Sequence, residues 1–153
     1  MHAYHEKPAT RLRLLCCLAE KDVRIVTIIL NKRKVYTKLK EEKAVLYNYV
    51  ANILLDRIFT KKLISAIGRI ELIAERRETN KFLNANFKDY LQRQVANKHS
   101  IDLKVEIKTS FEEKSLQAVD FASWAIFRKY ELRDDKYCKA IEGIIAEENP
   151  LFP

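Results

Sequence analysis

The sequence contains few of the residues that interrupt regular structure. Its 153 residues include two glycines and three prolines. This scarcity favours long helices and strands with short connections, because glycine and proline are the residues that most often mark turns. Gly68 and Gly143 lie too far apart to form a glycine-rich dinucleotide-binding loop or a Walker loop. Folds that bind nucleotides through such loops are therefore excluded.

Cysteine and histidine are also scarce, with three of each. Cys16 and Cys17 are adjacent and Cys138 is isolated, so the spacing is not that of a disulfide framework. We interpret the three thiols as small core residues, which suits a reducing, cytoplasmic location. The chain has no Cys-x-x-Cys or Gly-x-Ser-x-Gly motif, and His99 is interpreted as a helix-end residue. Structural zinc and nucleophilic catalysis are therefore not expected.

Long apolar runs are absent as well, and the first six residues lack the apolar core of a signal peptide. We therefore expect no membrane partner. Apolar residues make up 48% and charged residues 33% of the chain, which indicates one globular domain over residues 1–153. The net charge of +8 favours an anionic partner, nucleic acid first, although it also serves solubility.

Hydrophobic periodicity predicts alternating helices and strands. The last predicted strand alternates apolar with charged residues, as a strand with one solvent face does. The order of elements predicts a layered α/β fold, with helices on a small mixed or parallel sheet. Three strands are few, so we expect a missing N-terminal strand, or a partner chain or second copy that completes the sheet. The predicted helices span 9–21, 38–62, 80–98, 112–130 and 136–147, and the predicted strands span 23–30, 67–74 and 101–108.

One carboxylate, that of Asp120, falls within an apolar stripe of the helix predicted over 112–130. A carboxylate that faces inward is costly unless a cation or hydrogen-bond donors meet it. Two interpretations are open: Asp120 makes a buried ion pair or caps a neighbouring backbone, or it binds a divalent metal. The residues predicted to form the stripe are Leu116, Val119, Ser123, Trp124 and Phe127.

Three carboxylates are candidate metal ligands. Glu75 ends the second predicted strand, Glu6 precedes the first helix, and Asp120 is the third. Ligand sites in open α/β sheets gather at the carboxyl ends of strands, and Mg²⁺ prefers carboxylate oxygens. Two such ions can promote cleavage of a phosphodiester. For Glu75, an ion pair with a nearby arginine is the alternative. The candidate phosphate-binding residues are Lys7, Lys32, Arg76 and Arg77.

Residues 116–121, Leu-Gln-Ala-Val-Asp-Phe, together with 128–131 and 135–137, resemble the C-terminal signature of the domain-of-unknown-function 3800 family. Residues 5–7, 28–32 and 73–77 and Ser110 are similar to further elements of the same family, although position 75 is more often Asp there. Members are mostly bacterial and phage proteins. The resemblance implies a ribonuclease H-like fold and a nuclease-like site that uses Mg²⁺ or Mn²⁺. Its metal-binding and catalytic residues would be Asp120, Glu75 and Glu6.

The family begins with a strand that carries an Asp-Glu-Ser motif, and this chain begins downstream of it. We therefore expect an N-terminally truncated domain. Two functions follow. The first is a metal-dependent nuclease that acts on nucleic acid, with Arg76, Arg77 and Lys32 holding phosphate. The alternative is a catalytically inactive module that binds nucleic acid or a protein partner. No base-reading motif indicates whether DNA or RNA is bound.

Overall fold

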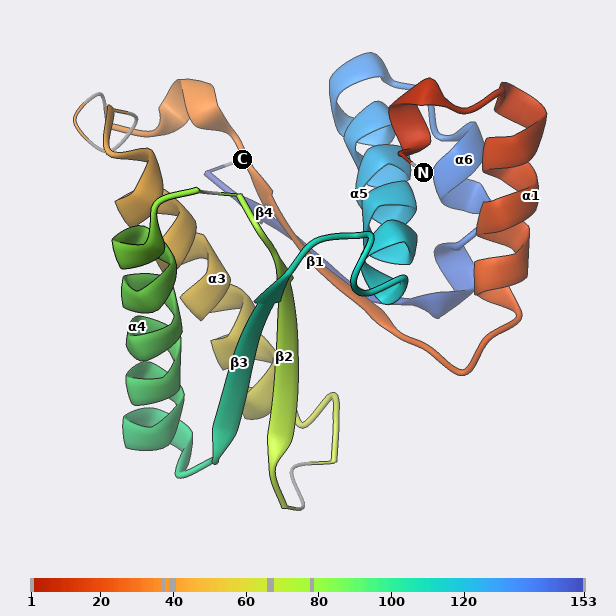
Figure 1. Cartoon of the computed structure of the whole chain (residues 1–153). Helices are drawn as coiled ribbons and strands as arrows, with labels where there is room; N and C mark the ends of the chain where they lie inside the picture. Colours follow the sequence, from red (N-terminus) through yellow and green to blue (C-terminus); the bar gives the residue numbers. More distant parts are fainter. Residues whose placement is uncertain (1, 37, 39–40, 66–67, 78, 153) are drawn as a thin grey trace. The chain divides into compact units, whose positions relative to one another are not determined.

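The computed structural model forms two compact units, which are described separately (Figure 1). Unit 1 comprises Met1–Ile25 and Thr109–Glu147, and unit 2 comprises Val26–Lys108 and Glu148–Pro153. The chain therefore passes from one unit to the other three times. The prediction of a single domain stays a prediction. The structure describes residues 2–36, 38, 41–65, 68–77 and 79–152.

Unit 1 is helical. Pro8 occupies the first turn of α1, where its fixed φ is favourable and its missing N–H is not needed. The longest helix of unit 1, α5, is capped at its C-terminus by Arg133, which adopts a left-handed conformation with φ 53° and donates its backbone N–H to the Arg128 carbonyl. The helical elements of unit 1 are η1 (Ala3–His5), α1 (Pro8–Ala19), α5 (Ser115–Leu132), α6 (Lys136–Lys139) and η3 (Glu142–Ile144).

The core of unit 1 joins residues from both ends of the chain. Leu15 from α1 and Ile141 are completely buried. The rings of Tyr137 and Trp124 meet edge to face, with centroids 4.7 Å apart. Burial of this apolar surface is the main stabilising contribution to the unit. The other buried members of the cluster are Ala3, Phe121, Ala122 and Ala125.

The buried face of α5 differs from the predicted stripe. Val119 and Phe127 were expected to be buried, but they are 58% and 56% exposed. The face that packs inward contains alanines, whose small side chains allow close approach of neighbouring helices. Alanine contributes a weak apolar signal beside aromatic residues, so the apolar pattern predicted the wrong face of α5 to be buried. The buried residues of α5 are Leu116, Phe121, Ala122, Ala125 and Ile126.

Unit 2 contains a β-α-β segment in which β2 (Ile70–Glu75) pairs in parallel with β3 (Leu103–Lys108). The helices α3 (Lys43–Thr60) and α4 (Lys81–His99) pack with these strands (Figure 1). The predicted strands and helices are thus confirmed here, with shorter ends. Positions 39, 40 and 67 of those predictions lie outside the described residues. The buried core residues are Leu55, Phe59, Phe87, Leu91, Val95, Leu103 and Val105.

The predicted alternation of β3 is confirmed. Leu103 and Val105 are buried, whereas the alternating charged residues Lys104, Glu106 and Lys108 lie on the other face of the sheet. Lys104 Nζ lies 3.3 Å from Glu71 and 2.6 Å from Glu106, and Lys108 Nζ lies 2.9 Å from Glu106. Hydrogen bonds from both lysines lower the pKa of Glu106 from 4.5 to about 2.

The C-terminal segment corrects the prediction of a helix over 136–147. The helix α6 ends at Lys139, and residues Ile145–Leu151 form β4, which pairs with β1 (Ile25–Leu30). Isoleucines at 141, 144 and 145 fit a helical stripe, but Gly143 and the β-branched pair that follows it favour a break and then a strand. Strand pairing therefore outweighed the apparent helical period.

In the described residues the chain is an α/β protein with five α-helices and two parallel two-stranded sheets, instead of the one sheet predicted. The ribonuclease H-like arrangement, and a partner that completes the sheet, stay predictions. Cys138 is buried as expected, but Cys16 and Cys17 are exposed, contrary to the prediction. Within the described part of the chain, no helix is long and apolar enough to cross a membrane.

The ion pairs of Glu106 predict a pH dependence of stability. Because the folded state lowers its pKa, these pairs stabilise the protein above about pH 4.5, and the contribution is lost as the pH falls from about 4.5 toward about 2. We expect the urea midpoint of the wild type to fall more steeply over this range than that of Glu106→Gln. Equal pH profiles would contradict the assignment. Added salt should reduce the difference, because the pairs are partly exposed.

Candidate functional site

The predicted site residues are divided between the two units. Residues of the first group belong to unit 1 and residues of the second to unit 2. Their union in one metal site stays a prediction. Glu6, Lys7 and Asp120 form the first group, and Lys32, Glu75, Arg76 and Arg77 form the second.

Asp120 meets a backbone donor. Its Oδ2 accepts the N–H of Ala3 at 2.9 Å and lies 3.6 Å from Nδ1 of His2. The Asp120 side chain is 34% exposed, so it lies at the border of the buried face of α5. Of the two interpretations of this carboxylate, the backbone cap is the one that the structure contains. A role as metal ligand stays a prediction.

Arg11 binds the carbonyl groups of the short helix η1, whose first N–H is bound by Asp120. The Arg11 side chain donates from Nε to the Ala3 carbonyl and from a terminal nitrogen to the Tyr4 carbonyl, each at 2.6 Å. Its guanidinium carbon lies 4.4 Å from the ring centroid of Trp124. Asp120 and Arg11 thus satisfy the N–H and the C=O of a residue that is completely buried. This arrangement fixes η1 against α1 and α5.

The other two predicted residues of unit 1 have local roles in the backbone. Glu6 ends η1 by donating its N–H to the Ala3 carbonyl, and Lys7 is the N-cap position of α1. Among the residues that the structure describes, no group of three or more His, Cys, Asp or Glu lies close enough to hold a metal ion. The hydrogen of the Ala3 N–H also points at Asp120 Oδ2, where it would oppose a cation. A Mg²⁺ site that includes these carboxylates stays a prediction.

In unit 2, Glu75 is the last residue of β2, and Arg76 extends the strand pairing by donating its N–H to the Lys108 carbonyl at 2.8 Å. Arg77 then turns toward α3. Lys32 lies in η2 (Lys32–Lys34) and is exposed. The carboxyl end of β2 therefore presents Glu75 and Arg77, as the sequence predicted.

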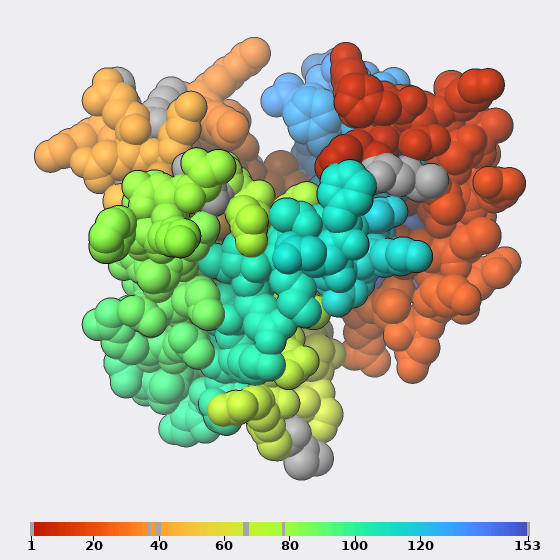
Figure 2. All heavy atoms as spheres, viewed as in Figure 1, coloured from red at the N-terminus to blue at the C-terminus, as the bar shows by residue number. Residues whose placement is uncertain are grey.

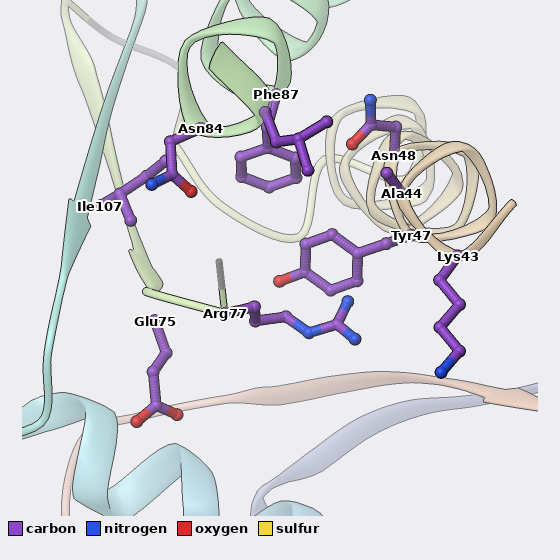
Figure 3. Close-up of a pocket in the computed structure, with 10 residues that line it drawn as sticks. Lys43, Ala44, Tyr47, Asn48, Glu75, Arg77, Asn84, Phe87 and Ile107 are labelled. Atoms are coloured by element: carbon purple, nitrogen blue, oxygen red, sulfur yellow. The ribbon is translucent and has the colours of Figure 1, made fainter. Parts of the chain in front are cut away.

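A small pocket of about 60 Å³ opens beside this strand end (Figure 3). The first turns of α3 and α4 form two of its sides, so backbone N–H groups with partial positive charge lie near it. Figure 2 shows α4 in green, with its side chains on the surface of the molecule. The pocket is lined by Lys43, Ala44, Tyr47, Asn48, Glu75, Arg77, Leu83, Asn84, Phe87 and Ile107.

Tyr47 and Arg77 form the centre of the pocket. The guanidinium carbon of Arg77 lies 4.0 Å from the Tyr47 ring centroid, and the Tyr47 ring stacks with the Phe87 ring, with centroids 5.2 Å apart and an interplanar angle of 28° (Figure 3). Burial raises the pKa of the Tyr47 hydroxyl, and the charge and hydrogen bond of Arg77 only partly offset this. The hydroxyl therefore stays protonated at neutral pH. The stacked ring restricts where the Arg77 fork can point.

The charged groups of the pocket favour an anion. Lys43 and Arg77 supply two positive charges, and Glu75 supplies one negative charge. Figure 3 shows the Glu75 carboxylate pointing away from the Tyr47 ring, whereas the Arg77 guanidinium lies beside it. The amide of Asn48 adds a neutral hydrogen-bonding group. A phosphate or carboxylate group fits this arrangement.

Sequence reasoning predicted Glu75 and Arg77 but missed the residues that complete the pocket. Tyr47 and Phe87 lie within the predicted helices 38–62 and 80–98, where neither was taken as a site residue, and Lys43 was not considered. Lys43 and Asn84 lie in the first two turns of helices, and both helices start near the carboxyl ends of the strands. That position could have identified them, because helix starts and strand ends meet at one edge of a β-α-β unit.

The Asp120 cap predicts a measurable loss of stability. Asp120→Ala leaves the part-buried N–H of Ala3 without its acceptor, which should reduce the free energy of unfolding by about 1–2 kcal/mol. Asp120→Asn keeps an acceptor and should lose less. Urea unfolding measures both. Asp135→Ala, which removes an exposed i,i+4 pair with Lys139, is the control and should change stability by less than about 0.5 kcal/mol.

Comparison of the chain with family models, curated proteins and solved structures gives no match.

Proposed function

We propose that this chain binds nucleic acid through phosphate groups, with the unit 2 pocket as the contact site. The observation that carries the proposal is Arg77, held over the Tyr47 ring beside Lys43 at the carboxyl end of β2. An arginine fork can donate two parallel hydrogen bonds to a phosphate, and stacking lowers the cost of orienting it. The net charge of +8 would attract the polyanion over a longer range.

Binding of this kind needs no metal and no catalytic carboxylate. It corresponds to the second of the two functions that the sequence indicates, the non-catalytic binding module. Phosphate contacts fix the position of a nucleic acid without reading its sequence, so we expect little preference among bases. They also release counterions, so the affinity should fall steeply as salt is added.

Replacing Arg77 tests this function. Arg77→Ala should weaken binding of an oligonucleotide about tenfold, the loss of a charge-assisted hydrogen bond worth about 1.5 kcal/mol. It should also reduce the slope of log K against log salt by about 0.7–0.9, one phosphate contact. Fluorescence polarisation over a salt series measures both quantities.

Arg69→Ala is the matched control. Arg69 belongs to the same unit, is exposed, and pairs with Asp102 at 2.9 Å instead of lining the pocket. Its removal should leave the salt slope nearly unchanged. If Arg69→Ala and Arg77→Ala weakened binding equally, the affinity would come from general positive charge and the pocket would not be the contact site.

As a second candidate we propose a metal-dependent nuclease of ribonuclease H-like fold. Two observations favour it: the likeness of residues 116–121 to the family signature, and the exposed Glu75 carboxylate at the end of β2 beside Arg77. In this candidate Asp120, Glu75 and Glu6 serve as the acidic residues, with Mg²⁺ or Mn²⁺ as cofactor.

The nuclease candidate predicts that cleavage of single- or double-stranded substrates requires Mg²⁺ or Mn²⁺ and is lost in Asp120→Asn and Glu75→Gln. Asp120→Asn must be shown by urea unfolding to remain folded, because Asp120 also caps Ala3. A calorimetric metal titration of the same variants reports binding independently of cleavage. Cleavage that persists in Asp120→Asn would remove this residue from any catalytic role.

A further inference from the structure

We infer that the unit 2 pocket receives the terminal phosphate of a single-stranded nucleic acid instead of a phosphate within the strand. This inference rests on the proposed function and names the ligand of that same site. It follows from the size of the pocket, its charges and one exposed aromatic residue that is adjacent in sequence to the pocket residue Leu83.

The size of the pocket is the first argument. Its volume of about 60 Å³ is far below the roughly 300–1,000 Å³ of pockets that enclose whole small molecules. A cavity needs about 10–15 Å³ to hold one water molecule, so the pocket has room for roughly four to six groups of that size. A tetrahedral phosphate has this size, whereas a base or sugar is too large. An internal phosphate carries two ester chains, and a terminal phosphate carries one, so only the terminal group can enter end-on.

The charges are the second argument. A terminal phosphate carries between one and two negative charges at neutral pH, because its second pKa is about 6. An internal phosphodiester carries one. Lys43 and Arg77 together match the terminal group, and its three unsubstituted oxygens suit an arginine fork plus a lysine. The protonated hydroxyl of Tyr47 is an additional donor at the same place.

Removing the charge of Glu75 should raise the affinity for a phosphate, whereas removing Lys43 or Arg77 should lower it. The Glu75 carboxylate lines the pocket and is close enough to raise the pKa of Tyr47, so it would repel a phosphate. Glu75→Gln should therefore tighten binding of a terminal phosphate. A gain of affinity cannot result from misfolding. The nuclease candidate gives Glu75 a different role and does not predict that gain.

Phe82 is the third observation. Its side chain is 87% exposed although it lies in the first turn of α4, next in sequence to Leu83 and Asn84 of the pocket. The Asn80 side chain accepts the N–H of Phe82 at 2.9 Å and so fixes the backbone of this turn. An unpaired base adjoining a bound terminal phosphate could stack on this ring. Bases within a duplex are already stacked on each other, so a single strand is favoured.

The experiment compares one single-stranded oligonucleotide in three forms: with a 5′-phosphate, with a 3′-phosphate and with hydroxyl groups at both ends. Fluorescence polarisation should show that one phosphorylated form binds about tenfold more tightly than the hydroxyl form, which also identifies the end that is read. Inorganic phosphate should compete with that form. The same phosphorylated strand annealed to its complement should bind more weakly.

Variants locate the effect. Lys43→Ala and Arg77→Ala should remove the preference for the phosphorylated end, Phe82→Ala should weaken all single strands, and Glu75→Gln should increase the preference. Arg69→Ala, the control outside the pocket, should keep it. Each of these side chains is exposed in the structure, and urea unfolding verifies that the variants remain folded.

The outcomes distinguish the terminal-phosphate inference from the proposed nucleic-acid binding. If all three forms bind alike while Arg77→Ala weakens them all, the terminal-phosphate inference is overturned and the proposed nucleic-acid binding stands. If no form binds the wild type, both are overturned. If Glu75→Gln weakens the phosphorylated form, the charge argument is overturned, because the carboxylate would then be assisting the ligand.

Discussion

The parallel pairing of β2 with β3 determines the geometry of unit 2. Two parallel strands cannot be joined by a tight turn, so the chain must return along α4 before β3 begins. This return places the start of α4 at the same edge as the ends of both strands. The start of α3 adjoins that edge, so a cation from α3 and another from the residues after β2 line one pocket. The position of Arg77 is thus a consequence of strand pairing.

Unit 1 shows how a partly buried carboxylate can be stabilised by a backbone N–H. Asp120 and Arg11 have opposite charges, yet the two side chains do not pair with each other. Each instead binds one end of the buried Ala3 residue. A backbone N–H and a backbone C=O that enter a core both need partners, and ionised side chains make the strongest ones. The acidic residue most suggestive of catalysis in the sequence therefore has a defined structural role.

Local patterns in the sequence predicted local structure well. The alternation from Leu103 to Lys108 depends only on the two-residue period of a strand, and β3 has it. Predictions were wrong where a pattern fits both the helical and the strand period. The isoleucines at 141, 144 and 145 suit a helix, yet Ile145 begins a strand. The prediction of the buried face of α5 was wrong because the alanines that pack inward give a weaker hydrophobic signal than Val119 and Phe127. Contacts between distant positions, such as that of Tyr47 with Arg77, could not be predicted, because they depend on how α3 packs beside β2.

The threefold passage of the chain between the units has a consequence for biosynthesis. Residues 26–108 leave the ribosome as one continuous piece that contains α3, β2, α4 and β3, so this β-α-β core can collapse while synthesis continues. Unit 1 has no such freedom, since Leu15 must wait for Tyr137 and Ile141 before its core exists. The segment that contains α1 is thus made long before the residues that it packs against. Contacts so distant along the chain slow folding, and α1 would stay exposed to chaperones and proteases until Tyr137 and Ile141 have been made.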